Sequence, residues 1–520
     1  MPDHGKRNFE NPSLSGFYPD PSICRVGEDY YLVTSSFAYF PGIPLFHSRD
    51  LVHWKQIGHV LDRPSQLDLD GVEHSEGIFA PTIRFHDGKF YVITTNITRG
   101  GNFIVTADRP EGPWSEPYWL TDAPGIDPSL FFDDDGRCWC VATWEVPEGP
   151  AYYGDNEIWM RELDLDTMTL KGERYGLWRG ALKNAIWPEA PHIYKKGGYY
   201  YLMIAEGGTD FHHSVTIARS RDIKGPYEGC PSNPILTHRH LGRGYPIVNV
   251  GHGDLVETQN GEWWMVLLAS RPYGGYYRNL GRETFLVPVI WEDGWPVVSP
   301  GTGRVEFSYS YPDLPSWEPE TPASVDHFDS SRLDPCWNFL RTPREDFYSL
   351  TERPGYLRLK VRPARLTELT NPSLVCRRQQ HMSFVARTVL EFDPDWDEAA
   401  GMVLLQSNRY HFRMEYALEG DQTIVRLIQC KDGVETLINA IPWHSDRFEM
   451  MISAHGQDLS FYFGDGEENI PLTQMVDGRI LSTDVAGGFV GTTIGLYASG
   501  NGRESHNNAD FDLFEYRAVL

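Results

Sequence analysis

The sequence predicts an all-β protein: a five-bladed β-propeller followed by a β-sandwich. Three observations support this prediction. The chain is rich in aromatic residues (16 Trp, 27 Tyr and 26 Phe) and also carries 49 Gly and 37 Pro. Aromatic side chains favour strands, whereas Gly and Pro punctuate turns. One phrase recurs five times in the N-terminal part, and the C-terminal part alternates apolar and polar residues at period two.

The recurring phrase starts with a small or acidic residue beside proline or glycine and continues as an apolar strand, a Gly-containing turn and an aromatic strand. This order is typical of a hairpin. The equivalent opening positions, about 47–63 residues apart, are Asp20, Ala80, Asp127, Glu189 and His252. Each interval fits one four-stranded blade, whose first strand lies beside the central channel of a propeller. The alternative is a run of unrelated hairpins.

Composition and periodicity divide the chain into three parts. Residues 1–311 are predicted to form the propeller. Residues 312–323 contain four prolines and read as a semi-rigid linker. Residues 324–520 contain short alternating segments such as YLRLKVRP and YHFRMEYAL, which predict a β-sandwich.

The charge balance bears on the class of partner. The chain has 46 Lys plus Arg against 72 Asp plus Glu, a net charge of −26. Nucleic acids and anionic membranes repel such a chain, so neither is an expected partner, whereas a neutral sugar suits it. Solubility alone also explains the acidity. A homo-oligomer is left open.

The cysteines and the N-terminal segment bear on location. Seven scattered cysteines without C-x-x-C spacing argue against a disulfide framework or a zinc site. The first residues have no apolar core of the signal-peptide kind, and no apolar run approaches a membrane span. We therefore expect a cytoplasmic protein.

Three of the five blade openings present an acid: Asp20, Asp127 and Glu189. Cleavage of a glycosidic bond needs one carboxylic acid to protonate the leaving oxygen and one carboxylate to activate water or attack the sugar. A third acid nearby raises the pKa of the proton donor by like-charge repulsion. Each acid taken alone is also explained as a cap on a turn. Together they indicate a catalytic set.

Four segments resemble glycoside hydrolase family 43, in particular its β-xylosidase and α-L-arabinofuranosidase branch: GFYPDPSICRV, GIDPSLFF, WPEAPHIYKK and LGRETFLVP. The resemblance extends from about Asn11 to Tyr516. It implies a propeller enzyme that hydrolyses with inversion. It further implies Asp20 as general base, Asp127 as the residue that modulates the pKa of the acid and orients it, and Glu189 as general acid.

The same resemblance implies further site residues. Arg282 would contact substrate hydroxyls and help keep the base ionised. His252 would lie on the axis, where some relatives bind calcium or water. Many relatives read GIWAP where this chain has GIFAP, so Phe79 replaces a larger tryptophan in the pocket wall. The identity of the preferred pentose is therefore left open. The implied pocket walls and hydroxyl contact are Phe37, Phe79, Trp144 and Thr209.

The C-terminal part resembles the concanavalin-like sandwich of the same family, through DHFDSSRLDPCWNFLR and ADFDLFEY. In such relatives a sandwich loop closes one end of the cleft, and here the candidate loop carries Phe489. An ordinary hairpin remote from the site is the alternative. Asp326 and Asp510 are candidate ligands of a structural calcium, while the chemistry itself is expected to require no cofactor.

The predicted function is an exo-acting, inverting glycoside hydrolase of xylan degradation. It would release terminal β-D-xylose, with α-L-arabinofuranose as a second sugar, from xylo-oligosaccharides or arabinoxylan fragments. A dedicated α-L-arabinofuranosidase stays open as the alternative. An endo-arabinanase is disfavoured because it needs an open cleft. A non-catalytic carbohydrate-binding propeller or a protein scaffold needs no set of three acids.

Overall fold

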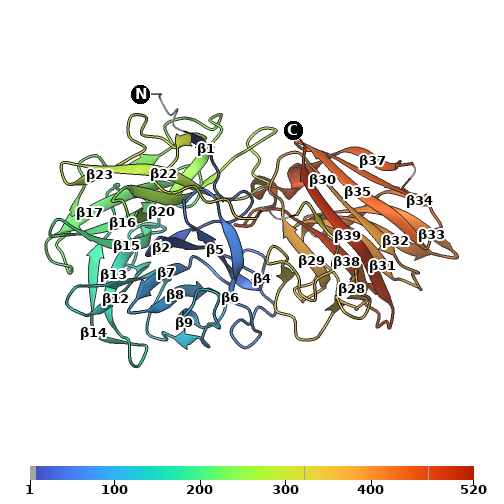
Figure 1. Cartoon of the computed structure of the whole chain (residues 1–520), viewed down its shortest axis with the longest axis horizontal. Coiled ribbons are helices and arrows are strands. Elements are labelled where there is room, and N and C mark those ends of the chain that lie inside the picture. Colours follow the sequence, from blue (N-terminus) through green and yellow to red (C-terminus); the bar gives the residue numbers. More distant parts are fainter. Residues whose placement is uncertain (1–6, 321–322, 467, 520) are drawn as a thin grey trace.

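The computed structural model describes residues 7–320, 323–466 and 468–519. It has two lobes side by side, an N-terminal lobe coloured blue to yellow-green and a C-terminal lobe coloured gold to red (Figure 1). Helical structure in the described residues is limited to the turn η1 (Gly478–Leu481) and to α1 (Thr483–Ala486). None of the described helices is long and apolar enough to cross a membrane. Residues 321 and 322 of the predicted linker lie outside the described residues.

Five antiparallel sheets form the N-terminal lobe, in the order of the five recurring phrases, which confirms the predicted five-bladed propeller. Blade one contains β2 (Ser22–Val26), β3 (Asp29–Val33), β5 (Gly42–Ser48) and β6 (Lys55–Leu61), and blade two contains β7 (Thr82–His86), β8 (Lys89–Asn96), β9 (Gly101–Ala107) and β10 (Tyr118–Trp119). Blade three contains β11 (Ile126–Phe132), β12 (Cys138–Glu145), β13 (Asn156–Asp164) and β14 (Thr169–Trp178), and blade four contains β15 (Glu189–Lys196), β16 (Tyr199–Glu206), β17 (Ser214–Ser220) and β18 (Glu228–Gly229), with β19 (Leu236–Thr237) beside β17. Blade five contains β20 (Val248–Glu257), β21 (Trp263–Ser270), β22 (Glu283–Glu292) and β23 (Trp295–Val298).

A buried ion pair ties the blades together at the propeller axis, where the first strands of neighbouring blades pack against one another. Asp254 on β20 is fully buried. Its carboxylate accepts hydrogen bonds from Ser22 Oγ on β2 (2.8 Å) and Tyr194 OH on β15 (2.7 Å). Arg84 on β7 donates to it at 2.9 Å. Four of the five blades therefore share one satisfied charge, as a buried carboxylate requires.

The N-terminal segment closes the ring by returning onto blade five. Strand β1 (Asn8–Glu10) pairs with β24 (Ser308–Ser310) just after the last blade. The Asn11 side chain donates to the Leu286 carbonyl at 2.9 Å and accepts from the Leu286 N–H at 3.0 Å. These bonds satisfy backbone groups on blade five and hold the N-terminal segment against the last blade of the propeller.

Two packed antiparallel sheets form the C-terminal lobe, and the predicted β-sandwich is confirmed. One sheet contains β27 (Tyr348–Ser349), β28 (Leu357–Lys360), β39 (Asn508–Ala518), β30 (Phe384–Glu391), β35 (Arg447–His455), β36 (Asp458–Gly464) and β37 (Ile470–Asp477), with β25 (Val325–Asp326) beside β39. The other contains β29 (Ser373–Arg378), β38 (Thr493–Ser499), β31 (Ala399–Ser407), β32 (Tyr410–Glu419), β33 (Gln422–Lys431) and β34 (Val434–Pro442).

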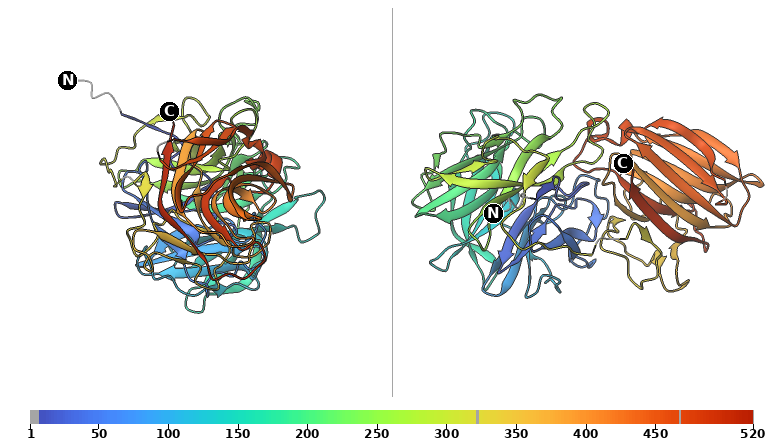
Figure 2. Two further views of the ribbon diagram at one scale, coloured as in Figure 1. Left: turned by 90° about the vertical axis from the view of Figure 1, so that its right-hand side faces the viewer. Right: turned by 45° about the horizontal axis from the view of Figure 1, so that its top comes forward.

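The two lobes share a hydrophobic core. Strand β26 (Phe339–Leu340) of the C-terminal lobe pairs with β4 (Tyr39–Phe40) of the propeller. The next residue, Arg341, is completely buried and donates through Nε to the Val72 carbonyl at 2.7 Å. One continuous apolar cluster contains buried side chains from both lobes, and the right-hand view of Figure 2 shows the two lobes side by side. The contact therefore resembles a domain interior more than a transient interface.

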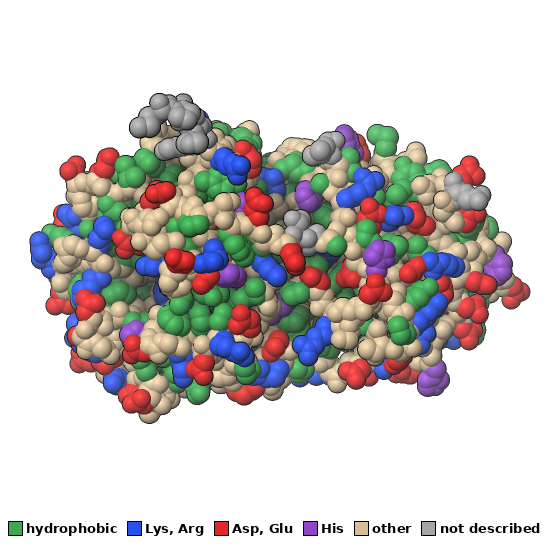
Figure 3. Space-filling view, in the orientation of Figure 1, with side chains coloured by type: hydrophobic (Ala, Val, Ile, Leu, Met, Phe, Trp, Pro, Cys, Tyr) green, Lys and Arg blue, Asp and Glu red, His purple; other side chains and the backbone are tan. Residues whose placement is uncertain are grey.

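The surface carries its acids in a dispersed arrangement. On the face drawn in Figure 3, Asp and Glu side chains are interspersed with Lys and Arg over both lobes. Acidic side chains on that face thus have basic neighbours. Surface ion pairs in the described residues include those of Arg344 with Asp68 and Asp70.

The shared core leads to a prediction about Phe339, which is 7% exposed and stacks on Phe40 with ring centroids 6.4 Å apart. We expect Phe339→Ala to lower the free energy of unfolding by about 3–5 kcal/mol. Because one core spans both lobes, calorimetry should show a single transition at a lower temperature. Two separate transitions, with only one of them shifted, would contradict a shared core.

Candidate active site

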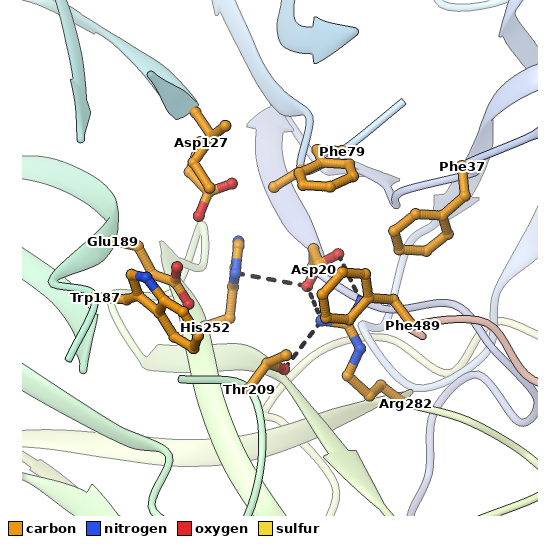
Figure 4. A pocket seen from close by; sticks show the side chains of 12 residues that line it. Asp20, Phe37, Phe79, Asp127, Trp187, Glu189, Thr209, His252, Arg282 and Phe489 are labelled. Atoms are coloured by element: carbon orange, nitrogen blue, oxygen red, sulfur yellow. Dashed lines mark hydrogen bonds and ion pairs between the residues drawn. The ribbon is translucent and has the colours of Figure 1, made fainter. Parts of the chain in front are cut away.

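A pocket of about 230 Å³ opens at one end of the propeller axis. This volume lies below the range of about 300–1,000 Å³ that drug-sized ligands fill, so it suits one small ring. Figure 4 shows its labelled side chains converging from several blades and from the C-terminal lobe. The lining residues are Asp20, Phe37, Phe79, Ala80, Ile126, Asp127, Trp187, Glu189, Thr209, His252, Arg282 and Phe489.

An unusual backbone aims the polar side chains into this pocket. Asp20, Asp127 and His252 have φ values of 57°, 53° and 49°, in the left-handed region that non-glycine residues seldom adopt. The ladders of β11, β15 and β20 also shift register near Asp127, Glu189 and His252. Such bulges turn a side chain away from its regular face. Backbone strain of this kind is characteristic of functional sites.

Asp20 is held as a carboxylate. Arg282 Nη1 donates to its Oδ1 at 2.7 Å, Ser35 Oγ donates to its Oδ2 at 2.5 Å, and His252 Nδ1 lies 3.6 Å from Oδ1. Burial alone raises the pKa of Asp20, but Arg282, His252 and the Ser35 hydroxyl outweigh it and lower that pKa below its ordinary value. Asp20 therefore stays ionised into the acidic range.

Glu189 and Asp127 have the opposite tendency. Burial, followed by the neighbouring Asp127 and Asp20 carboxyls, raises the pKa of Glu189 well above its ordinary value. Burial likewise raises the pKa of Asp127 to about 6, with His252 opposing the rise and Asp20 adding to it. In Figure 4 the Glu189 and Asp20 carboxyls lie on either side of His252. The pocket thus contains one carboxyl group whose pKa is lowered, that of Asp20, and two whose pKa values are raised, those of Asp127 and Glu189.

Aromatic rings form the apolar walls, as predicted for Phe37, Phe79 and Phe489. Phe37 and Phe489 are nearly parallel, at 23° and 6.2 Å between centroids, and Phe79 meets Phe489 edge to face at 6.0 Å. Thr209, also predicted, accepts a hydrogen bond from Arg282 Nη1 at 3.0 Å. Such rings offer flat surfaces to the C–H face of a sugar.

Phe489 comes from the C-terminal lobe, in the segment between α1 and β38. Its backbone N–H donates to Ser75 Oγ of the propeller at 2.8 Å. A Cβ on the preceding Gly488 would lie 2.2 Å from the same Ser75 oxygen, and its φ of 77° is in the left-handed region. Glycine is therefore needed for this close approach. The structure places the predicted capping loop at the pocket.

One predicted wall residue is corrected. Trp144 does not line the pocket: it lies near the end of β12 and is 44% exposed. Trp187, which sequence reasoning missed, lines the pocket instead. Its backbone N–H donates to the Gly154 carbonyl at 2.7 Å, and Tyr153 packs edge-on against its ring. Its place two residues before Glu189 in WPEAP is the signal that could have identified it.

The predicted calcium ligands are engaged elsewhere. Asp510 accepts from Arg353 and Arg358 at 2.8 Å, while Asp326 accepts from the Trp337 indole at 2.8 Å. These two carboxylates therefore have separate protein partners and do not form the predicted shared site. His252, the other candidate, faces Asp20. Within the described ranges, no group of three or more His, Cys, Asp or Glu side chains is arranged to hold a metal ion.

The fold and the pocket define a β-propeller protein with buried acids on its axis and a sandwich lobe that contributes one wall. Residues 9–296 match the model of glycosyl hydrolases family 43. Residues 325–517 match the beta xylosidase C-terminal concanavalin A-like domain. The chain belongs to glycosyl hydrolases family 43.

Relatives match along nearly the whole chain. A xylosidase/arabinosidase of Butyrivibrio fibrisolvens is 51% identical over 98% of this chain and 99% of its own. A non-reducing end alpha-L-arabinofuranosidase of Bacteroides ovatus is 40% identical over 99% of this chain and 96% of its own. The crystal structure of a xylan beta-1,4-xylosidase from Bacillus halodurans is 38% identical with a TM-score of 0.92, covering 98% of this chain and all of that one.

The raised pKa of Asp127 has a consequence for stability. The folded chain holds this proton more tightly than the unfolded chain, whose Asp pKa is near 3.8. The resulting stabilisation is complete below about pH 3.8 and is lost as the pH rises through about 6. Asp127→Asn cannot ionise, so we expect it to gain roughly 2–3 kcal/mol relative to wild type between about pH 4 and pH 7.5.

Thermal unfolding of the two proteins at both pH values checks this. The Tm difference between the variant and wild type should become more favourable to the variant as the pH rises. A Tm difference that is the same at both pH values would contradict a buried, protonated Asp127.

Proposed function

We propose that this protein is an exo-acting, inverting glycosidase that releases one terminal pentose, β-D-xylose with α-L-arabinofuranose as a second sugar, from xylo-oligosaccharides or arabinoxylan fragments. The observation that carries the proposal is the division of protons in the pocket. Asp20 is held ionised while Glu189 is held protonated, the two states that acid–base cleavage of a glycoside requires.

In the proposed reaction, the Asp20 carboxylate takes a proton from a water molecule as the water oxygen attacks the anomeric carbon. The bond from that carbon to the leaving oxygen breaks, and this oxygen receives the proton of Glu189. Water enters on the face opposite the leaving group, so the configuration inverts. The cycle is restored when Asp20 loses the proton it gained and Glu189 regains one. The proton transfers require no cofactor.

The neighbouring groups maintain these states. The Arg282 guanidinium stabilises ionised Asp20 and has a further contact, to Thr209. Asp127 is close enough to raise the pKa of Glu189. We assign Asp127 to this modulating role, because a third acid that holds the proton donor neutral lets it donate near neutral pH. Arg282 is assigned to both substrate contact and support of the base.

The exo mode follows from the size and closure of the pocket. A volume of about 230 Å³ walled by Phe489 from the second lobe accommodates one sugar at a chain end rather than the middle of a polymer. The relatives named as xylosidase/arabinosidase and as xylan beta-1,4-xylosidase support a terminal pentose. A dedicated α-L-arabinofuranosidase is the second candidate, supported by the relative of that name in Bacteroides ovatus.

Initial rates on 4-nitrophenyl β-D-xyloside and 4-nitrophenyl α-L-arabinofuranoside, followed by xylobiose and arabinan fragments, test the proposal. We expect hydrolysis of both aryl glycosides, with the xyloside and xylobiose preferred. Activity restricted to the arabinofuranoside and arabinan fragments would favour the second candidate. Absence of turnover on every pentoside would overturn the assignment as a pentosidase.

The general acid is tested by leaving-group dependence. Glu189→Gln removes the proton donor, which contributes roughly 10²–10⁴-fold to a rate. We expect a loss of that size on xylobiose, whose leaving oxygen needs the proton, and a much smaller loss on 2,4-dinitrophenyl β-D-xyloside, whose leaving group departs unaided.

Asp20→Asn serves as the matched control for this prediction. It removes the base, which every substrate needs, so the fractional losses of kcat on the two xylosides should be similar. Equal losses in the Glu189→Gln variant as well would exclude Glu189 as the acid.

A further inference from the structure

Arg278 lies in the loop between β21 and β22 and is 8% exposed. It is one of the lining residues of a second cavity, of about 500 Å³, that adjoins the pocket described above. The two cavities share four lining residues, Trp187, Thr209, Arg282 and Phe489. This shared set of four is called here the common wall. Arg278 itself does not line the acid-containing pocket.

The strongest contact of Arg278 crosses between the lobes. Its backbone N–H donates to Asp484 Oδ2 at 2.8 Å, and its side chain donates to Asp484 Oδ1 through Nε at 3.0 Å and Nη2 at 2.7 Å. Thr483 Oγ1 donates back to the Arg278 carbonyl at 3.2 Å. The Asp484 side chain is 14% exposed, so both partners are largely removed from water. Several hydrogen bonds in one geometry make this a well-defined link.

The remaining arm of the guanidinium reaches a third segment. Nη1 of Arg278 donates to Asp210 Oδ1 at 3.1 Å. Asp210 follows directly on Thr209 in the turn between β16 and β17. The loop that carries Arg278 itself continues to Arg282. Asp484, in α1, is five residues ahead of Phe489. One side chain therefore joins the three segments that carry Thr209, Arg282 and Phe489.

We infer that Arg278 is a positioning residue that holds the common wall in place for substrate, acting chiefly through Asp484 on Phe489. The inference rests on the proposed function and adds to it a residue that fixes the sugar without touching it. Removing either Arg278 or Asp484 leaves the other charge largely buried without its partner, which is costly. The two side chains therefore hold the lobes together only as a pair. Its loss frees the Phe489 segment while leaving Asp20 and Glu189 in place.

Steady-state kinetics on 4-nitrophenyl β-D-xyloside tests this. We expect Arg278→Gln to raise KM roughly tenfold, equivalent to about 1.4 kcal/mol, with kcat within about threefold of wild type. This is the pattern for lost substrate positioning rather than lost chemistry. The matched control is Arg344→Gln, because Arg344 also forms ion pairs across the lobes, with Asp68 at 2.6 Å and Asp70 at 3.0 Å, but lines neither cavity.

The control separates positioning from general loosening of the interface. Arg344→Gln should leave KM unchanged even if its Tm falls as much as that of Arg278→Gln. If the two variants raise KM equally, or if Arg278→Gln leaves KM unchanged, the inference is overturned. If the wild-type enzyme hydrolyses a pentoside, either of these outcomes overturns the inference about Arg278 but not the proposed function. No turnover of any pentoside by the wild type would instead remove the proposed function, and this inference with it.

A double-mutant cycle tests the route through Phe489. If Arg278 acts by fixing that ring, Arg278→Gln should change KM by less than about twofold in a Phe489→Ala background, because coupled residues are not additive. Fully additive effects would refute this route. Should Arg278→Gln fail to fold, Asp484→Asn retains the shape of the side chain and should raise KM in the same direction. An unchanged KM in that variant contradicts the inference equally.

Discussion

The removal of three neighbouring carboxyl groups from water in one small pocket, with repulsion between them, is the constraint on which the rest of this structure depends. Asp20 and Asp127 are buried and Glu189 is half-buried in the same pocket, and the three cannot all be charged at once without great cost. Arg282, His252 and Ser35 stabilise the charge on Asp20. The pKa values of the other two acids are raised instead, chiefly by burial. Burial raises the pKa of all three acids, and only at Asp20 do Arg282, His252 and Ser35 reverse that direction, which divides the set into base and acid.

The propeller satisfies that constraint by bringing sequence-distant strands to one axis. Left-handed backbone at Asp20, Asp127 and His252, together with bulged ladders near Asp127 and His252, turns their side chains into the pocket. Strained backbone persists only when its surroundings hold it. Here the Asp254–Arg84 ion pair, together with its hydroxyl donors, ties four blades at the same axis. The shared core with the sandwich lobe holds the pocket from the other side.

Much of the site is visible in the sequence because a repeat marks equivalent positions. The openings of the blades identify Asp20, Asp127 and Glu189 without knowledge of the fold, and the pocket brings all three together. Trp144 and Trp187 show where that reasoning stops. The resemblance alone assigns Trp144 to the pocket wall, whereas this side chain lies near the end of β12 and is 44% exposed. Trp187 is held by a hydrogen bond to the Gly154 carbonyl, and a contact between segments this far apart cannot be predicted from the residues around Trp187.

Contacts between the lobes are likewise beyond prediction from the sequence. Arg278 and Asp484 are 206 positions apart, and each is an unremarkable charged residue in its own segment. The resemblance placed Phe489 near the pocket but gave no account of what holds it. The calcium prediction for Asp510 failed for the same reason, since the arginines that occupy its carboxylate come from strands and turns with no shared motif.

The central claim is that ionised Asp20 activates water while protonated Glu189 serves the leaving oxygen, each in a single displacement. Proton NMR of the sugar first released from 4-nitrophenyl β-D-xyloside tests this most directly, if recorded before the anomers equilibrate. A single displacement inverts the anomeric centre, so α-D-xylose should appear first. Initial release of β-D-xylose would mean two displacements and a covalent intermediate, and would contradict the roles assigned to both carboxyl groups.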